Sequence, residues 1–122
     1  MERVIIADDH EIVRNALVRL INDRYTEEVE TVDDGEPLVE KVREGNYSVV
    51  ITDERMKEMS GLDAIFEIRK FNTEVPIIMV SNSDIAGVAM SSGATEYLEK
   101  IHAVGNPDLL YACLDNYMKQ KV

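Results

Sequence analysis

Five polar side chains stand where short apolar runs of this sequence end. They share one position, the residue at or just beyond the carboxyl end of a run: Asp8, Asp9, Asp53, Ser81 and Lys100. If the runs are parallel strands of one sheet, their carboxyl ends meet at one edge, where such sheets bind ligands. Three carboxylates, one hydroxyl and one ammonium would then face the same space.

Carboxylates gathered so closely repel one another unless a cation lies between them. The three acids carry −3 and Lys100 carries +1, so one divalent cation balances the remaining −2. Oxygen ligands favour Mg²⁺, with Mn²⁺ as a substitute, over Zn²⁺, because the usual His and Cys ligands of zinc are absent from this set. A carboxylate beside Mg²⁺ and a lysine can attack a phosphoryl group, whose charge the same cations stabilise.

Each of these residues also has a simpler explanation when it is taken alone. Asp8 and Asp9 could cap a helix, and Asp53 could belong to a turn. A lysine that follows a strand is usually just solvated. Only the coincidence of these residues at one edge of a sheet predicts a site.

The elements that would bring these residues together alternate between strands and helices along the chain. Apolar runs predict strands near 3–7, 28–32, 48–52, 76–80 and 96–99. Apolar stripes at helical spacing predict helices near 11–22, 36–44, 61–70, 84–91 and 107–119. This order predicts an α/β fold: one domain over 1–122 with a doubly wound, five-stranded parallel sheet. The last residues, 119–122, are expected to be frayed.

Composition limits the partners and the setting of the protein. The chain of 122 residues has a formal net charge of −11, which argues against direct nucleic-acid binding because no basic surplus is available for phosphates. No segment reaches the length of a membrane span, and the apolar N-terminal run is too short for a signal peptide. Cys113 is the single cysteine, so an internal disulfide is impossible and a cytoplasmic location is expected. Its place on an apolar helical face predicts a buried structural thiol.

Several segments together resemble the receiver domains of two-component response regulators, the CheY-like family. The matching segments run through essentially the whole chain: Val4–His10, Asp53–Met56 with Met59 and Gly61, Pro76–Ser81, Gly93–Ala94 and Tyr97–Lys100. Each segment alone is a weak signal, but the set is specific. The resemblance implies a flavodoxin-like, CheY-like (βα)5 fold with strand order 2-1-3-4-5, forming a single receiver domain over 1–122.

The resemblance also implies a role for each acid. Asp53 would accept a phosphoryl group from a phosphohistidine on a sensor histidine kinase or a histidine phosphotransfer protein. Asp9, Asp53 and the backbone carbonyl of Arg55 would hold Mg²⁺. Asp8 would act largely through a metal-bound water, and Lys100 would pair with Asp53 or with the phosphoryl oxygens.

The same resemblance implies a conformational switch and residues that set the lifetime of the phosphorylated state. Ser81 would turn to hydrogen-bond the phosphoryl group, and Tyr97 would move into the space that it leaves. The alternative is a partly buried Tyr97 that never switches. Arg55 and Ser83 would flank the path of the attacking water, and an arginine there leads to the hypothesis that self-dephosphorylation is slow.

Several positions depart from the family pattern or match none of its roles. Lys57 replaces a usual proline, so a less rigid loop is expected, and Asn82 replaces a usual small residue and would narrow access to the site. Ile101 replaces a proline that often follows a cis bond. We expect a trans bond there, because a cis bond before a residue other than proline is costly. His10 and His102 match no required role and are interpreted as incidental.

The spacing after the fourth strand also departs from the pattern. Ser81 and Gly93 are 12 residues apart, so the helix near 84–91 or the loop before it should be about one turn shorter than usual. The chain between Lys100 and Pro107 is correspondingly longer. Both changes fall on the face that the family uses for output, so a rebuilt output face is expected and phosphorylation-dependent homodimerisation stays open.

Three functions are therefore weighed. The favoured one is a phosphoacceptor switch that acts on a downstream protein or effector domain, with no enzymatic activity beyond self-catalysed phosphotransfer and dephosphorylation. A Mg²⁺-dependent aspartyl phosphatase would need a second acid two residues after its nucleophile, where Arg55 stands, and inserted cap segments. A receiver-fold adaptor that is never phosphorylated is compatible with the departures from the pattern.

Overall fold

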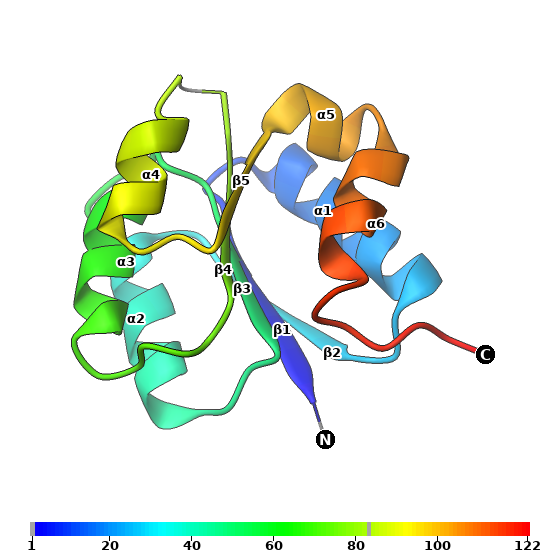
Figure 1. The fold of residues 1–122 in the computed structure, drawn as a ribbon, viewed down its shortest axis with the longest axis horizontal. Helices are drawn as coiled ribbons and strands as arrows, with labels where there is room; N and C mark the ends of the chain where they lie inside the picture. Colours follow the sequence, from blue (N-terminus) through cyan, green and yellow to red (C-terminus); the bar gives the residue numbers. More distant parts are fainter. Residues whose placement is uncertain (1, 83) are drawn as a thin grey trace.

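One parallel sheet with helices on both faces forms the protein in the computed structural model, which describes residues 2–82 and 84–122 (Figure 1). The strands are β1 (Arg3–Ala7), β2 (Glu28–Val32), β3 (Val49–Thr52), β4 (Ile77–Ser81) and β5 (Glu96–Glu99). The helices are α1 (Glu11–Arg24), α2 (Gly35–Glu44), α3 (Gly61–Arg69), α4 (Ala86–Ser92), α5 (Lys100–Val104) and α6 (Pro107–Leu114). The strand order β2-β1-β3-β4-β5 confirms the doubly wound fold that the sequence predicts.

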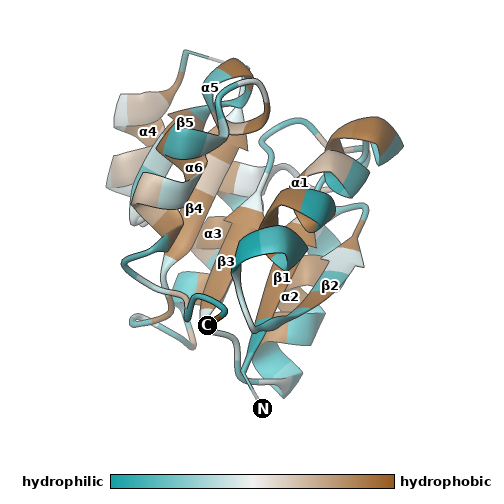
Figure 2. Ribbon diagram, turned by 90° about the vertical axis from the view of Figure 1, so that its right-hand side faces the viewer, coloured by the Kyte–Doolittle hydropathy of each residue, from teal (hydrophilic) through white to brown (hydrophobic). Residues whose placement is uncertain are grey.

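The central strands are buried on both faces, which is why their sequences are apolar without interruption (Figure 2). Side chains alternate between the two faces of a strand. In β1, Val4 and Ile6 therefore pack in a core with α1, α5 and α6. Ile5 and Ala7 pack in a second core with α2, α3 and α4. The sheet is thus held rigidly between two helical layers.

Helix α5 was not expected. No helix or strand was predicted between Lys100 and Pro107, where the chain is longer than the family pattern, and the structure has a short helix there that begins at Lys100 itself. Five residues are too few for an apolar stripe to repeat, so periodicity gives no signal. Ala103, which is fully buried, anchors this helix in the core beside α6.

The prediction for the C-terminal part of the chain was wrong in two respects. Helix α6 ends at Leu114 instead of near residue 119, and a series of turns follows it. The segment after it is docked rather than frayed: the backbone N–H of Thr26 donates to the carbonyl oxygen of Lys119, and that of Lys121 donates to Arg24, both at 2.8 Å. Gln120 forms an isolated antiparallel bridge with Tyr25.

The remaining bounds agree with the prediction to within two residues. Helix α4 is short, with seven residues, in agreement with the shortened segment expected after Ser81. It ends at Gly93, whose φ of 114° lies in the left-handed region that glycine adopts without strain. The described residues contain no cis peptide bond, so the trans bond expected before Ile101 is confirmed.

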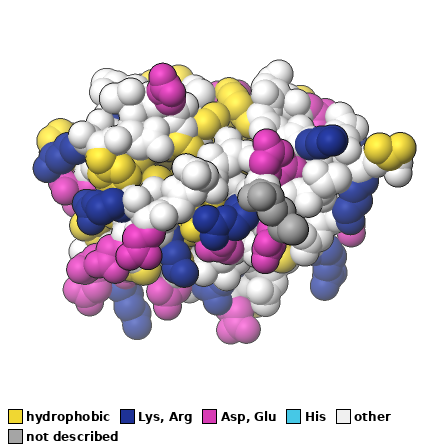
Figure 3. All heavy atoms as spheres, turned by 90° about the horizontal axis from the view of Figure 1, so that it is seen from below, with side chains coloured by type: hydrophobic (Ala, Val, Ile, Leu, Met, Phe, Trp, Pro, Cys, Tyr) yellow, Lys and Arg dark blue, Asp and Glu magenta, His cyan; other side chains and the backbone are white. Residues whose placement is uncertain are grey.

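Two further expectations, a buried Cys113 and the absence of a membrane-spanning helix, concern the core and the surface. Cys113 is buried in α6, as expected, and burial followed by the nearby Glu96 raises the pKa of its thiol to about 12. Acidic and basic side chains lie interspersed on the face seen from below, at the amino ends of the strands (Figure 3). Within the described residues, no helix is both long and apolar enough to cross a membrane.

Candidate functional site

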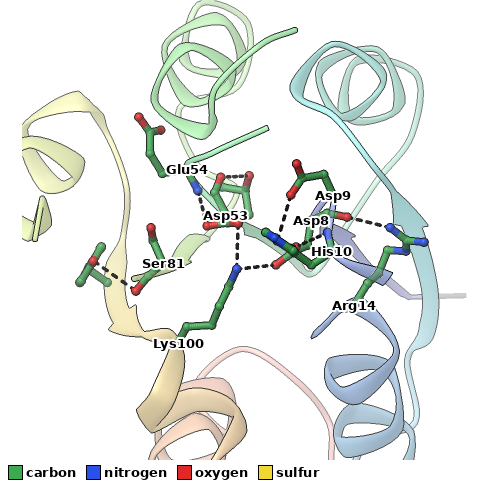
Figure 4. Close-up of polar contacts among 10 residues, drawn as sticks. Asp8, Asp9, His10, Arg14, Asp53, Glu54, Ser81 and Lys100 are labelled. Carbon is green, nitrogen blue, oxygen red and sulfur yellow. Dashed lines mark hydrogen bonds and ion pairs between the residues drawn. The ribbon is translucent and has the colours of Figure 1, made fainter. Parts of the chain in front are cut away.

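Asp8 and Asp53 are brought together by the register of two neighbouring strands. Ala7 lies opposite Thr52 at the ends of β1 and β3, so the next residue of each strand extends into the same space (Figure 4). The backbone N–H of Asp53 donates to the carbonyl oxygen of Ala7 at 2.9 Å, which holds the two strand ends together. Asp8 is 1% exposed and Asp53 is 4% exposed, so both carboxylates are largely shielded from bulk water.

Lys100 bridges these two carboxylates. Its Nζ lies 2.8 Å from Oδ2 of Asp53 and 3.1 Å from Oδ2 of Asp8. Burial lowers the pKa of Lys100, but the hydrogen bonds and negative charges of the two aspartates outweigh burial and raise the pKa overall. Because Lys100 is the first residue of α5, the unexpected helix anchored by Ala103 is what aims the ammonium at the acids.

Asp9 and His10 complete a group of four side chains that are close enough to hold one metal ion. One ligand atom from each of Asp8, Asp9, His10 and Asp53 lies within 4.8 Å of the others. Nδ1 of His10 is 3.1 Å from Oδ1 of Asp9, and the side chains of Asp9 and His10 are more exposed than that of Asp8. His10 was not predicted to belong to this group, although its place directly after the acid pair was a usable signal.

The donor chemistry of the group fits Mg²⁺. Three carboxylates supply hard oxygen ligands, and one ammonium is too little positive charge to balance them. The backbone carbonyl of Arg55, which the resemblance adds to the ligands, belongs to the loop directly after Asp53. An oxygen-rich site with a net negative charge is what a small divalent cation requires.

Ser81 ends the next strand beside Asp53, and Tyr97 lies on β5 next to Ser81. Ser81 is the last residue of β4 and is 1% exposed. The hydroxyl of Tyr97, on β5, donates to the backbone carbonyl oxygen of Ser81 at 3.4 Å. Burial, followed by the charge of Glu99, raises the pKa of Tyr97, so this phenol stays neutral. The two switch candidates are therefore in direct contact.

A cavity of about 520 Å³ opens over these residues. Its lining combines acidic, basic and polar side chains from the carboxyl-end edge of the sheet: His10, Asp53, Arg55, Ser81, Asn82, Asp84 and Lys100. Asn82 lines this cavity, as expected of a residue that narrows access to the site, and the volume still accommodates a phosphoryl group. Ser83, the other expected modulator of dephosphorylation, lies outside the described residues.

The loop between β3 and α3 is held at both ends by carboxylates, although Lys57 replaces a usual proline. Asp34 accepts hydrogen bonds from the backbone N–H groups of Glu58 and Met59, each at 2.9 Å, and also from that of Gly35. Burial raises the pKa of Asp34, but these hydrogen bonds outweigh it and leave the pKa below its ordinary value. The loop that carries Arg55 is therefore tied to the start of α2.

The other end of this loop closes tightly on Asp53. Glu54 accepts a hydrogen bond from the backbone N–H of Leu62 at 2.8 Å, and burial raises the pKa of Glu54. A Cβ atom at Gly61 would overlap the backbone carbonyl oxygen of Asp53, so only glycine allows α3 to begin this close to β3. The Glu54 N–H in turn donates to Oδ1 of Asp53 at 2.7 Å. The carboxylate is thus fixed from both sides.

Comparison with known proteins agrees with this geometry. The sequence model of the response regulator receiver domain matches residues 4–110. The chain is 38% identical over 106 residues to the transcriptional regulatory protein YdfI of Bacillus subtilis, covering 82% of this chain and 48% of that protein. This chain spans about half or less of the length of the curated relatives it matches first.

Solved structures give the same result. The response regulator TrrA of Thermotoga maritima, solved in complex with Mg²⁺ and BeF, superposes with a TM-score of 0.82 at 29% identity, covering 97% of this chain and 100% of TrrA. The chemotaxis response regulator CheY4 of Vibrio cholerae superposes with a TM-score of 0.83 at 26% identity, covering 97% and 99%. Both likenesses extend over the sheet and its two helical layers.

Proposed function

This chain belongs to the receiver domains of two-component response regulators, and we propose on that basis that Asp53 is its phosphoacceptor. The observation that carries the proposal is the immobilised carboxylate of Asp53. Its Oδ2 lies 2.8 Å from the Lys100 ammonium, and its Oδ1 accepts the Glu54 N–H. A nucleophile held this firmly at the floor of a polar cavity needs little reorganisation before it reacts.

The proposed transfer starts from a phosphohistidine on a sensor histidine kinase or a histidine phosphotransfer protein. A bond forms between a carboxylate oxygen of Asp53 and phosphorus, and the bond from phosphorus to the donor imidazole breaks, with its electron pair leaving on the imidazole. Asp9, Asp53 and the Arg55 carbonyl would hold Mg²⁺ directly, and Asp8 would hold it through water. When bound, Mg²⁺, or Mn²⁺ in its place, neutralises charge on the phosphoryl oxygens.

The residues around Asp53 provide the response to phosphorylation. Lys100 is placed to transfer its hydrogen bond from the free carboxylate to a phosphoryl oxygen. The Ser81 hydroxyl donates to the phosphoryl group, and Tyr97, already hydrogen-bonded to the Ser81 backbone, moves with it. The local change in charge thereby biases a two-state element on the β4–β5 side of the protein.

This role makes the chain a switch and not an enzyme beyond its own phosphorylation and dephosphorylation. Its output would be a downstream protein or an effector domain, because the relatives it matches include transcriptional regulators that are longer than this chain. We propose that the protein acts in the cytoplasm and binds neither nucleic acid nor membranes directly. The net charge of −11 disfavours contact with the phosphates of nucleic acid. A homodimer formed on phosphorylation is a further proposal for the β5 side.

Labelling with a small phosphodonor tests the proposal. The protein is incubated with Mg²⁺ and acetyl phosphate and its intact mass is measured. We expect one phosphoryl group per chain in the wild type and in Asp108→Asn, which changes an exposed acid on α6, and none in Asp53→Asn. Continuous consumption of the donor would favour the phosphatase instead, and the absence of labelling would favour the constitutive adaptor.

The same samples report the lifetime of the acyl phosphate. Arg55 lines the cavity next to Asp53, where its guanidinium is able to pair with phosphoryl oxygens and exclude water. We therefore propose slow self-dephosphorylation, with Arg55 as the shielding residue and Ser83 as its partner in setting the rate. A phosphoryl half-life of seconds after removal of the donor would contradict this.

A further inference from the structure

We propose that His10 is a nitrogen ligand of the metal site and that it allows a transition-metal ion such as Ni²⁺ or Zn²⁺ to compete there with Mg²⁺. The inference rests on the proposed cation site at Asp8, Asp9 and Asp53, and it adds a second class of cation to that site. The placement of His10 among these acids carries the argument (Figure 4).

The distances suit a shared ion. Two ligand atoms bound at right angles to one ion, each at about 2.1 Å, lie about 3.0 Å apart. Nδ1 of His10 is 3.1 Å from Oδ1 of Asp9 and 3.5 Å from Oδ1 of Asp8. The imidazole therefore already lies at ligand spacing from both acids.

The backbone of His10 is fixed while its side chain remains accessible. Its N–H donates to Oδ1 of Asp8 at 2.8 Å, and its carbonyl oxygen accepts the N–H of Arg14 at 2.9 Å in the first turn of α1. The side chain itself is 66% exposed and lines the cavity over Asp53. An ion arriving from solvent thus meets the imidazole at the mouth of the site.

The chemistry of imidazole separates two kinds of cation. Mg²⁺ is a hard ion that prefers oxygen and keeps much of its water, so a neighbouring imidazole adds little to its binding. Ni²⁺ and Zn²⁺ bind nitrogen readily and stand above Mn²⁺ in general affinity for such sites. With His10 beside three carboxylates, the site offers a mixed nitrogen and oxygen set to these ions and an all-oxygen set to Mg²⁺.

A simpler role for His10 is an ion pair with Asp9 and no part in metal binding. That role predicts the same change in affinity for every divalent cation when His10 is replaced, because only the local charge changes. A ligand role predicts a change confined to ions that bind nitrogen. The two roles are therefore separated by comparing metals and not by measuring one alone.

Calorimetric titrations of the full chain with Mg²⁺ and with Ni²⁺ make this comparison. The variants are His10→Asn, which keeps the backbone N–H that donates to Asp8, and His102→Asn, which removes the other, exposed histidine from α5. Loss of even an outer partner of a metal ligand lowers affinity by about tenfold or more. We expect Ni²⁺ affinity to fall by at least that factor in His10→Asn, with Mg²⁺ affinity nearly unchanged, and neither affinity to change in His102→Asn.

The visible absorption band of bound Ni²⁺ gives a second readout, since it shifts when a nitrogen ligand is replaced by water. Equal losses for both metals in His10→Asn, no loss for Ni²⁺, or the same loss in His102→Asn would each overturn the inference. No phosphodonor is present in these titrations. A failure of Asp53 to accept a phosphoryl group would therefore leave the metal affinities as they are, and the two proposals fail separately.

Discussion

Two clusters of charged residues at opposite ends of α1 differ in their charge balance. Beside the start of α1, Lys100 faces Asp8 and Asp53, with Asp9 close by, so one ammonium stands against three carboxylates. Beside the end of α1, Arg24 and Asp115 form a one-to-one pair through two hydrogen bonds of 2.9 and 2.7 Å. The first cluster is negative and, apart from Asp9, buried, whereas the second is partly exposed and neutral.

The difference in charge balance distinguishes the proposed phosphorylation site from a structural ion pair. The Arg24–Asp115 pair is completed by Tyr25, whose hydroxyl donates to Oδ1 of Asp115 at 2.7 Å, and nothing more is required to balance it. It joins α1 to the end of α6, beside the docked C-terminal segment. The cluster at Asp53 keeps an excess of negative charge that a purely structural cluster would not need. Such an excess is useful when a cation and a phosphoryl group are to be bound.

Among the substitutions that test this difference, removal of the Lys100 ammonium should change the stability of the protein most. Lys100→Met keeps the apolar stem but leaves Asp8 and Asp53 as buried, unpaired charges. Loss of one partner of a buried ion pair costs about 3 kcal/mol or more. We expect a fall of that size in the free energy of unfolding at pH 7 without Mg²⁺, measured by urea denaturation.

A double variant controls for loss of packing. In Lys100→Met combined with Asp53→Asn, one of the unpaired charges is gone, so much of the lost stability should return. If Lys100→Met alone unfolds at the same urea concentration as the wild type, Lys100 does not stabilise the buried carboxylates of Asp8 and Asp53.

The two clusters also differ in how far the sequence predicted them. The sequence predicted that four residues meet, because each stands at the end of a strand that the apolar pattern defines: Asp8, Asp53, Ser81 and Lys100. A parallel sheet places the carboxyl ends of its strands at one edge. The Arg24–Asp115 pair joins residues 91 positions apart, one at the end of α1 and the other directly after α6. No local pattern distinguishes such a pair from solvated charges.

The errors elsewhere have the same physical origin. Helix α5 is too short to show a period, and the docking of 119–121 depends on backbone groups near Tyr25 that carry no sequence signal. The roles of Asp34 in holding the loop that carries Arg55 and of His10 beside the acids depend on tertiary placement in the same way. The apolar pattern of the sequence predicts the helices and strands and the ends of the strands. Contacts between loops depend on the tertiary structure and leave no such pattern.

Mg²⁺ should stabilise the protein through one cluster and not through the other. An ion that binds only the folded state at ten times its dissociation constant adds about 1.4 kcal/mol of stability. Thermal unfolding with and without Mg²⁺ should therefore show a higher midpoint in the wild type and in Asp115→Asn, and no shift in Asp9→Asn. Without metal, Asp9→Asn should not lower the midpoint, because it relieves repulsion among the acids. An equal Mg²⁺ shift in Asp9→Asn would place the bound cation elsewhere.

The smallest effect is expected at the neutral cluster, and it depends on pH. Hydrogen bonds from Arg24 and then Tyr25 hold the pKa of Asp115 at about 2, below its ordinary value. A carboxylate whose pKa is lower in the folded state contributes stability above its unfolded pKa and loses it as the pH falls through the folded pKa. The difference in unfolding free energy between the wild type and Asp115→Asn should hence be constant near neutrality and shrink as the pH falls below about 4 toward 2.

Urea denaturation at a series of pH values measures this difference, with Asp108→Asn on the exposed face of α6 as the control. A difference that stays the same down to the acid limit would mean that Asp115 acts through neutral hydrogen bonds alone, and the contrast with the charged cluster at Asp53 would then rest on burial and not on charge balance.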